Sequence, residues 1–197
     1  MRTTPASKRQ PRAATGNDGS SRGHRRAALL AAMADHLLVH GLEGSPLRAL
    51  GAAAETSDRM LIYYFTDRST LMTDLLDFTA SRLATLLADG NGERRPYSDL
   101  LSWLWSMTQT PAFRPYMLLF VALAAAAGRS EEPYRTAAGR IAQAFIDWVA
   151  ARLDAGEEVR RAQAALLLAT LDGLFLLDCV GCDAEAEIAM TIAGDRH

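Results

Sequence analysis

The chain has 197 residues, 21 basic and 23 acidic side chains, a formal net charge of −2 and 49% hydrophobic residues. This composition is typical of a globular protein of one or two domains, and it excludes a disordered or fibrous chain. Two cysteines are too few for a disulfide framework, and no run of about 18 uncharged apolar residues predicts a membrane span. The N-terminus also lacks the apolar segment of a secretory signal, so we expect a cytoplasmic protein that contacts no membrane.

The charge is distributed unevenly along the chain. Residues 1–68 hold ten basic and six acidic side chains, whereas residues 69–197 hold eleven basic and seventeen acidic ones. Such an asymmetry favours an N-terminal part that meets a polyanion, although basic segments are often only solvated tails.

The N-terminal segment predicts an arm followed by a helix. Residues 1–21 are rich in Ser, Thr, Pro, Gly and Arg without periodicity, which indicates a disordered basic arm. From Arg25 onward, apolar residues recur at spacings of three and four, which places them on one face of a helix. Gly41 is expected to end this helix, because glycine adopts the left-handed cap conformation without a Cβ penalty.

Two shorter helices are expected next. Ser45 and Pro46 predict the start of a helix at 47–54, with the Ser45 hydroxyl capping a free amide. Ser57 is a second N-cap, and the helix that it opens runs to about Phe65. Three helices with a tight turn before the third form a helix-turn-helix arrangement.

The rest of the chain continues in helical patterns. No alternating strand pattern, no glycine-rich phosphate loop and no catalytic motif is found, so we predict an all-α fold of about nine helices that is not an enzyme and needs no cofactor. The six further helices are expected at about 70–88, 98–108, 111–127, 133–153, 157–180 and 183–193.

Residues 25–72 resemble the N-terminal DNA-binding domain of TetR-family transcriptional regulators. The resemblance is carried by the glycine-ended first helix, the serine-started second helix, and a third helix that ends in Ile62-Tyr63-Tyr64-Phe65 before Arg68 and Leu71. It implies three parts: a basic arm at 1–21, a helix-turn-helix domain at 22–68, and a helical ligand-binding and dimerisation domain at 69–197.

Three positions depart from the family pattern. Glu55 or its neighbour replaces the turn glycine, so the turn must form with a non-glycine residue at modest cost. Met60 replaces the usual Thr, and Ile62 replaces a Tyr that would donate a hydrogen bond to phosphate. These changes affect which operator is read more than whether DNA is bound.

The resemblance implies a near-palindromic double-stranded DNA operator that is read by the third helix. Arg59 is the candidate for a bidentate guanine contact, and Asp58 either accepts from cytosine or pairs with Arg59. Arg22, Arg25 and Arg26 are expected on an arm that touches the DNA backbone or minor groove. The candidate DNA-binding residues are Arg25, Arg26, Ser45, Arg48, Ser57, Asp58, Arg59, Met60, Tyr63, Tyr64 and Arg68.

The C-terminal part is apolar, with few convergent polar groups, as helix-lined ligand sites often are. The resemblance implies that a small apolar molecule binds there, whereas for any single residue a place in an ordinary core remains an alternative. The candidate pocket residues are Trp103, Met107, Phe113, Met117, Phe120, Phe145, Trp148 and Asp172.

The penultimate helix is apolar nearly all round, so it must be buried on more than one side. The resemblance implies a homodimer whose seam is a four-helix bundle, with Leu168, Leu171, Phe175 and Cys179 at the interface. No metal site is expected, since Cys179 and Cys182 form a lone C-x-x-C without a second ligand pair.

The leading hypothesis is a ligand-responsive DNA-binding regulator that acts as a repressor and is released from DNA by an effector. One alternative is a regulator that senses thiol chemistry or a metal through Cys179 and Cys182. The other is a helical small-molecule-binding or enzymatic domain that does not bind DNA.

Overall fold

The computed structural model describes residues 18–88 and 92–195, and these ranges form nine α-helices and no strand. The predicted all-α fold is confirmed. The helices are α1 (Asp18–His40), α2 (Leu47–Ala53), α3 (Asp58–Phe65), α4 (Arg68–Ala88), α5 (Tyr97–Thr108), α6 (Arg114–Gly128), α7 (Tyr134–Arg152), α8 (Glu157–Cys179) and α9 (Asp183–Asp195).

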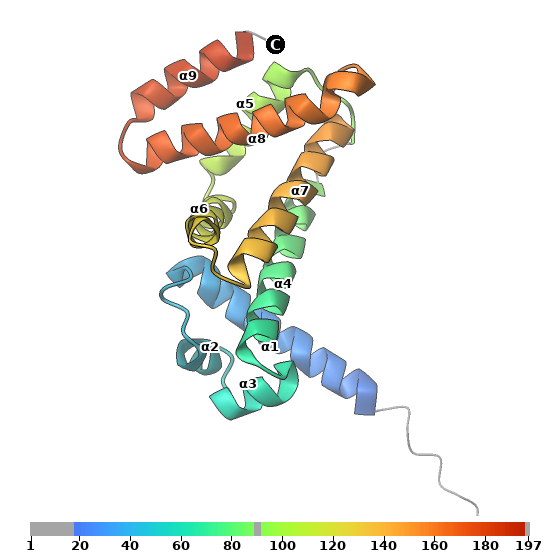
Figure 1. Ribbon diagram of the computed structural model, residues 1–197, viewed down its shortest axis with the longest axis vertical. Helices are drawn as coiled ribbons and strands as arrows, with labels where there is room; N and C mark the ends of the chain where they lie inside the picture. Colours follow the sequence, from blue (N-terminus) through green and yellow to red (C-terminus); the bar gives the residue numbers. More distant parts are fainter. Residues whose placement is uncertain (1–17, 89–91, 196–197) are drawn as a thin grey trace, which may run out of the picture.

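Helices α1 to α3 form a head at one end of the molecule, and α5, α8 and α9 lie at the other end (Figure 1). Helices α4 and α7 pack side by side along the long axis between the two ends. Among the described residues, the only β-type backbone pairing is one isolated parallel bridge between Arg95 and Leu153. Helices α4 and α7 therefore connect the head to the helices of the distal end.

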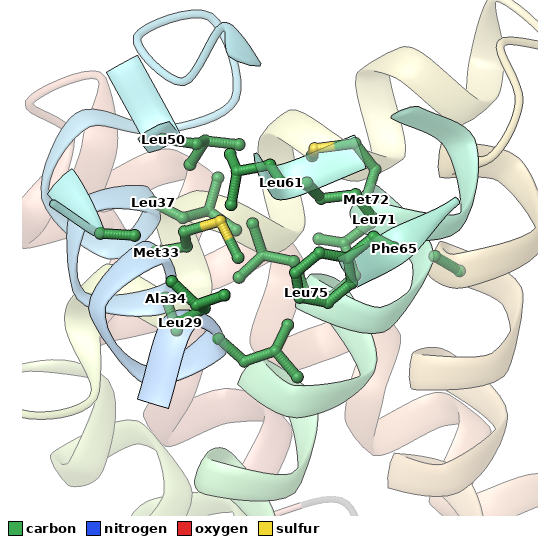
Figure 2. Packing of buried hydrophobic residues seen from close by; sticks show 14 of the residues in the cluster. Leu29, Met33, Ala34, Leu37, Leu50, Leu61, Phe65, Leu71, Met72 and Leu75 are labelled. Carbon is green, nitrogen blue, oxygen red and sulfur yellow. The ribbon is translucent and has the colours of Figure 1, made fainter. Parts of the chain in front are cut away.

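The head has its own apolar core, to which α4 contributes. Figure 2 shows Met33 and Leu37 of α1 packed with Leu61 and Phe65 of α3 and with Leu75 of α4. The same cluster continues into residues of α6 and α7. The expected domain boundary at residue 68 coincides with the start of α4, yet the packing crosses it without interruption.

Helix α1 begins earlier than the sequence pattern predicted. It starts at Asp18 instead of Arg25, so the expectation of an arm to residue 21 is wrong for its last four residues, while residues 1–17 lie outside the described ranges. The first turns carry no apolar periodicity. Their helix is supported by a long-range contact, because the Arg22 guanidinium lies 5.0 Å from the centre of the Tyr63 ring.

Capping groups set the other early helix ends. Gly41 has φ +67° and ends α1 as expected. The Ser57 hydroxyl accepts a hydrogen bond from the Met60 amide at 3.3 Å, which is the predicted N-cap of α3. The Asp67 carboxylate accepts one from the Thr70 amide at 2.7 Å, and this bond lowers the pKa of Asp67.

The predicted cap of α2 is wrong. Pro46, not Ser45, occupies the N-cap position, and it makes no side-chain capping bond. Ser45 is buried, and its hydroxyl donates a hydrogen bond to the Gly41 carbonyl oxygen at 2.7 Å. The hydroxyl therefore closes the loop after α1 and leaves the amides of α2 free.

The turn between α2 and α3 forms without glycine. Glu55 has φ +49°, in the left-handed region that costs a non-glycine residue about 1 kcal/mol. The close approach of the two helices is absorbed by Gly51, where a Cβ would lie 3.1 Å from both the Thr56 carbonyl oxygen and Asp58 Oδ1. The prediction that this turn forms with a non-glycine residue is thus confirmed, and the residue is Glu55.

Candidate nucleic-acid interface and interior cavity

Helix α3 presents one polar face to solvent. Its buried residues are Leu61 and Phe65, which anchor the helix in the core of the head. Because the two anchors are four residues apart, they lie on one side of the helix, and the side chains on the opposite side face outward. The exposed side chains on or next to α3 are Ser57, Asp58, Arg59, Met60 and Tyr63, as the sequence predicted.

Three arginines of the candidate interface are exposed. Arg48 lies on α2, Arg59 on α3, and Arg68 in the first turn of α4. Within the described residues, no ion pair engages any of these three guanidinium groups. They are therefore available for phosphates or base edges.

The arginines near the start of α1 lie on a helix and not on an extended arm, which corrects the sequence expectation. Arg26 forms an ion pair with Asp74 of α4, and its guanidinium lies 4.8 Å from the centre of the Phe65 ring. Arg22 donates a hydrogen bond to the Tyr63 carbonyl oxygen at 3.3 Å. Arg25 is exposed. Arg26 thus braces the head, whereas Arg25 faces solvent.

Two other candidate DNA contacts are partly or fully withdrawn from the surface. Tyr64 is half-buried against the core of the head, with its ring edge-on to Tyr63 at 5.4 Å between centroids. The Ser45 side chain is buried and committed to Gly41, so its hydroxyl does not face a ligand. Periodicity did not reveal this, because both residues sit at loop or helix-end positions.

A cavity of about 160 Å³ lies between α4, α6, α7 and α8. The sequence predicted that α5 contributes Trp103 and Met107 to the pocket. The structure corrects this, since neither Trp103 nor Met107 reaches the cavity, and Trp103 instead stacks on Trp148 at 6.1 Å. The expected residues that do line it are Phe113, Met117, Phe120, Phe145, Trp148 and Asp172.

Sequence reasoning missed the wall that α4 supplies. Leu76, Leu83 and Leu87 line the cavity from α4, and Tyr116 lines it from α6. The apolar stripe of α4 was visible in the sequence, but its pattern does not say whether it faces a solid core or a cavity.

Asp172 is the acidic residue of the cavity wall. Its Oδ1 atom is buried and has no hydrogen-bond partner among the described residues. Burial raises the pKa of Asp172 to about 6, because an apolar environment disfavours the charged carboxylate.

Helix α8 divides its apolar residues between two faces. Leu171 and Phe175 are buried in the core of the chain itself, so their assignment to a dimer seam is wrong. Leu168 is half-buried and lines the cavity. Cys179 is exposed. An apolar run without gaps carries no periodic signal that identifies the outward face. That face is made of Val159, Ala162, Leu166, Ala169, Gly173, Leu176 and Val180.

The two cysteines are free thiols at the end of α8. Although Cys179 is exposed, partial desolvation of its thiol raises its pKa, which lowers its thiolate fraction and therefore its reactivity. Among the described residues, no group of three or more His, Cys, Asp or Glu side chains could hold a metal ion.

Comparison with known proteins places the fold. No family model and no curated protein matches the chain. A TetR-family regulator from Cytophaga hutchinsonii matches with a TM-score of 0.69 at 15% identity, over 89% of this chain and 94% of that one. A transcriptional regulator from Rhodococcus sp. Rha1 matches with a TM-score of 0.68 at 24% identity, over 86% and 94%.

A third match is the reduced form of E. coli NemR, with a TM-score of 0.61 at 22% identity, over 86% of this chain and 95% of that one. These likenesses extend over most of each chain and include both the head and the distal helices. The chain therefore has the all-helical fold of TetR-family transcriptional regulators.

Proposed function

We propose that the protein is a DNA-binding transcriptional regulator that represses from a palindromic operator and is released by a small molecule. The observation that carries this proposal is the exposed polar face of α3, held outward by the buried side chains of Leu61 and Phe65. An anchored short helix that follows a tight turn is the geometry that enters a major groove.

Each exposed group of the head has a role in this proposal. Arg59 makes a bidentate contact to a guanine, and Arg48 reaches a base edge from α2. Arg25 and Arg68 contact phosphates, which set the register of the protein on the duplex but not the sequence it reads. Tyr63, with its ring under the Arg22 guanidinium, presents its hydroxyl beside them.

The exposed apolar surface at the distal end supports a homodimer as part of this proposal. The outward residues of α8 recur at alternating spacings of three and four, which is the seam pattern of a helical bundle. Ile188 and Ile192 extend this surface onto α9. Two copies related by a two-fold axis would bury both helices against their counterparts and hold two heads over successive half-sites.

This dimer also accounts for the composition of α8. Among the described residues, α8 is the one helix long and apolar enough to cross a membrane by length and composition. One of its faces packs on α7, α9 and α5, and the opposite face carries the apolar seam. Burial on both sides in a cytoplasmic dimer explains the same apolarity without a membrane.

The cavity is placed to influence the head. Leu119 and Leu123 of α6 line the cavity and also belong to the core cluster of the head. Because packed cores respond to a new occupant by shifting whole elements, a ligand that displaces α6 changes the position of α1. An effector that binds more tightly to the conformation in which the spacing of the two heads does not fit successive major grooves would then release the protein from its operator.

The test is selection of bound duplexes from a random DNA pool with the full chain, followed by titration of the selected duplex at two salt concentrations. We expect a palindromic duplex whose affinity falls steeply with salt. The matched control is the Arg59→Ala/Arg68→Ala variant, which should bind the selected duplex more weakly than the unaltered chain does. Absence of enrichment with the unaltered chain would refute DNA binding.

A further inference from the structure

The cavity wall is mostly apolar and has few polar side chains. Twenty residues line it, and only Thr79, Tyr116 and Asp172 have an oxygen atom in their side chains. No lysine, arginine or histidine is among them. The groups that can meet the polar part of a bound molecule are therefore these three side-chain oxygens and the indole N–H of Trp148.

Two of the three oxygens are already engaged within the chain. The Thr79 hydroxyl donates a hydrogen bond to the Leu75 carbonyl oxygen at 2.8 Å. The Tyr116 side chain interacts with the Arg82 guanidinium of α4, whose pKa is raised mainly by Asp35 and to a lesser extent by Tyr116. Asp172 Oδ1 is buried and has no partner among the described residues. Asp172 is thus the group left to interact with a cavity occupant.

The cations of the surrounding helices do not compensate this carboxylate. Arg82 of α4 is paired with Asp35. Arg114 of α6 is paired with Asp178. A carboxylate buried in apolar surroundings without a counter-charge is unfavourable, and the protein retains it at the wall of the cavity. A positively charged occupant would remove that penalty by supplying both the missing charge and the missing donor.

We propose that the cavity binds a small lipophilic organic cation, an amine whose ammonium group donates a hydrogen bond to Asp172 while its apolar body fills the remaining space. This proposal rests on the effector role proposed for the cavity above. The aromatic rings of Phe113, Phe145 and Trp148 line the same space, and aromatic faces attract cations. An acid is excluded because its carboxylate would face Asp172 without a cation between them.

The volume limits the size of this occupant. An apolar cavity of about 150 Å³ engineered in another protein admits one benzene ring, so a cavity of about 160 Å³ suits one ring with a short chain. Four compounds with nearly the same skeleton then separate charge from shape. They are phenethylamine, phenethyl alcohol, phenylacetate and ethylbenzene.

The experiment is calorimetric titration of the full chain with each compound at neutral pH. We expect phenethylamine to bind at least about tenfold more tightly than phenethyl alcohol, because hydrogen bonds to charged groups are the stronger ones. Asp172→Asn should weaken phenethylamine by about tenfold or more and leave the affinity for phenethyl alcohol nearly unchanged. Glu158→Gln, which removes an exposed charge from the same helix, should change neither affinity.

Three results would contradict the proposal that the cavity binds an amine. Equal affinity of phenethylamine for the unaltered chain and for Asp172→Asn would overturn the proposal, as would tighter binding of phenylacetate or no binding of any compound. Thermal melting of Asp172→Asn verifies that the variant is folded before the comparison is made. Selection of an operator needs no ligand, so failure of DNA binding with amine binding intact would refute the regulator function alone.

Discussion

Arg26 of α1 is paired with Asp74 of α4, and this pair ties the first helix of the head to the helix that lines the cavity. The guanidinium also lies over the Phe65 ring of α3, so one side chain joins three helices. Arg25, its neighbour in sequence, is exposed. Adjacent arginines therefore have separate roles, one in the stability of the head and one at its surface.

Arg26→Ala should lower the free energy of unfolding by about 1–2 kcal/mol, because it removes a partly exposed ion pair and a cation–π contact. Urea unfolding measures this change. Arg25→Ala is the matched control on the same helix and should leave stability within about 0.5 kcal/mol. Equal destabilisation by the two variants would contradict the bracing role of Arg26.

Arg59→Ala and Arg68→Ala should weaken operator binding in different ways. Loss of a guanine contact at Arg59 should cost about 1–3 kcal/mol and relax the sequence preference at one position of each half-site. Loss of a phosphate contact at Arg68 should weaken all duplexes alike and reduce the salt slope by about one. Fluorescence anisotropy with matched and mismatched duplexes measures both effects. Arg161→Ala, on α8 at the distal end, is the control that should change neither.

Leu176→Glu should convert the dimer to a monomer. Leu176 is 48% exposed in the single chain, toward the C-terminal end of the outward face of α8, and a dimer would bury it. Analytical ultracentrifugation measures whether each variant is a dimer or a monomer. Leu118→Glu is the control, because Leu118 is equally exposed at 49% but lies on α6. A dimer that persists in Leu176→Glu would argue against this seam.

Asp172→Asn should stabilise the protein at neutral pH. Burial raises the pKa of Asp172 from 3.8 to about 6, so the folded state holds its proton more tightly than the unfolded state does. The resulting penalty is absent below about pH 4, grows as pH rises to about 6, and then reaches about 3 kcal/mol. Unfolding curves should show Asp172→Asn more stable at pH 7 and equal to the unaltered chain near pH 4. An equal difference at both values would mean that ionisation is not the cause.

Glu55→Gly should stabilise the head by about 0.5–1 kcal/mol, because Glu55 adopts φ +49° and glycine has no Cβ to strain there. Ala52→Gly, in the adjacent helix α2, is the opposite control and should destabilise by a similar amount. Thermal unfolding compares the two variants. A loss of stability in Glu55→Gly would show that the unfolded-state entropy of glycine outweighs the relieved strain.

The local elements were predictable because their causes are local. Gly41 ends α1 and Ser57 caps α3 through contacts with residues a few positions away, so the sequence alone located these ends. The start of α1 and the cap of α2 were not predicted correctly. The start of α1 is stabilised by the contact between Arg22 and Tyr63, which are far apart in the sequence. The Ser45 hydroxyl donates a hydrogen bond to the Gly41 carbonyl oxygen instead of capping an amide of α2.

The sequence by itself determined the helical architecture, the exposed face of α3 and most of the aromatic lining of the cavity, because helical spacing assigns faces wherever apolar and polar residues alternate. Only the tertiary structure decided which side of α8 is buried, since a helix that is apolar all round has no such alternation. It also decided that Trp103 lies outside the cavity and that Asp172 lines it, with an Oδ1 atom that has no hydrogen-bond partner in the described part of the chain. Both depend on how distant helices pack, which no local spacing encodes.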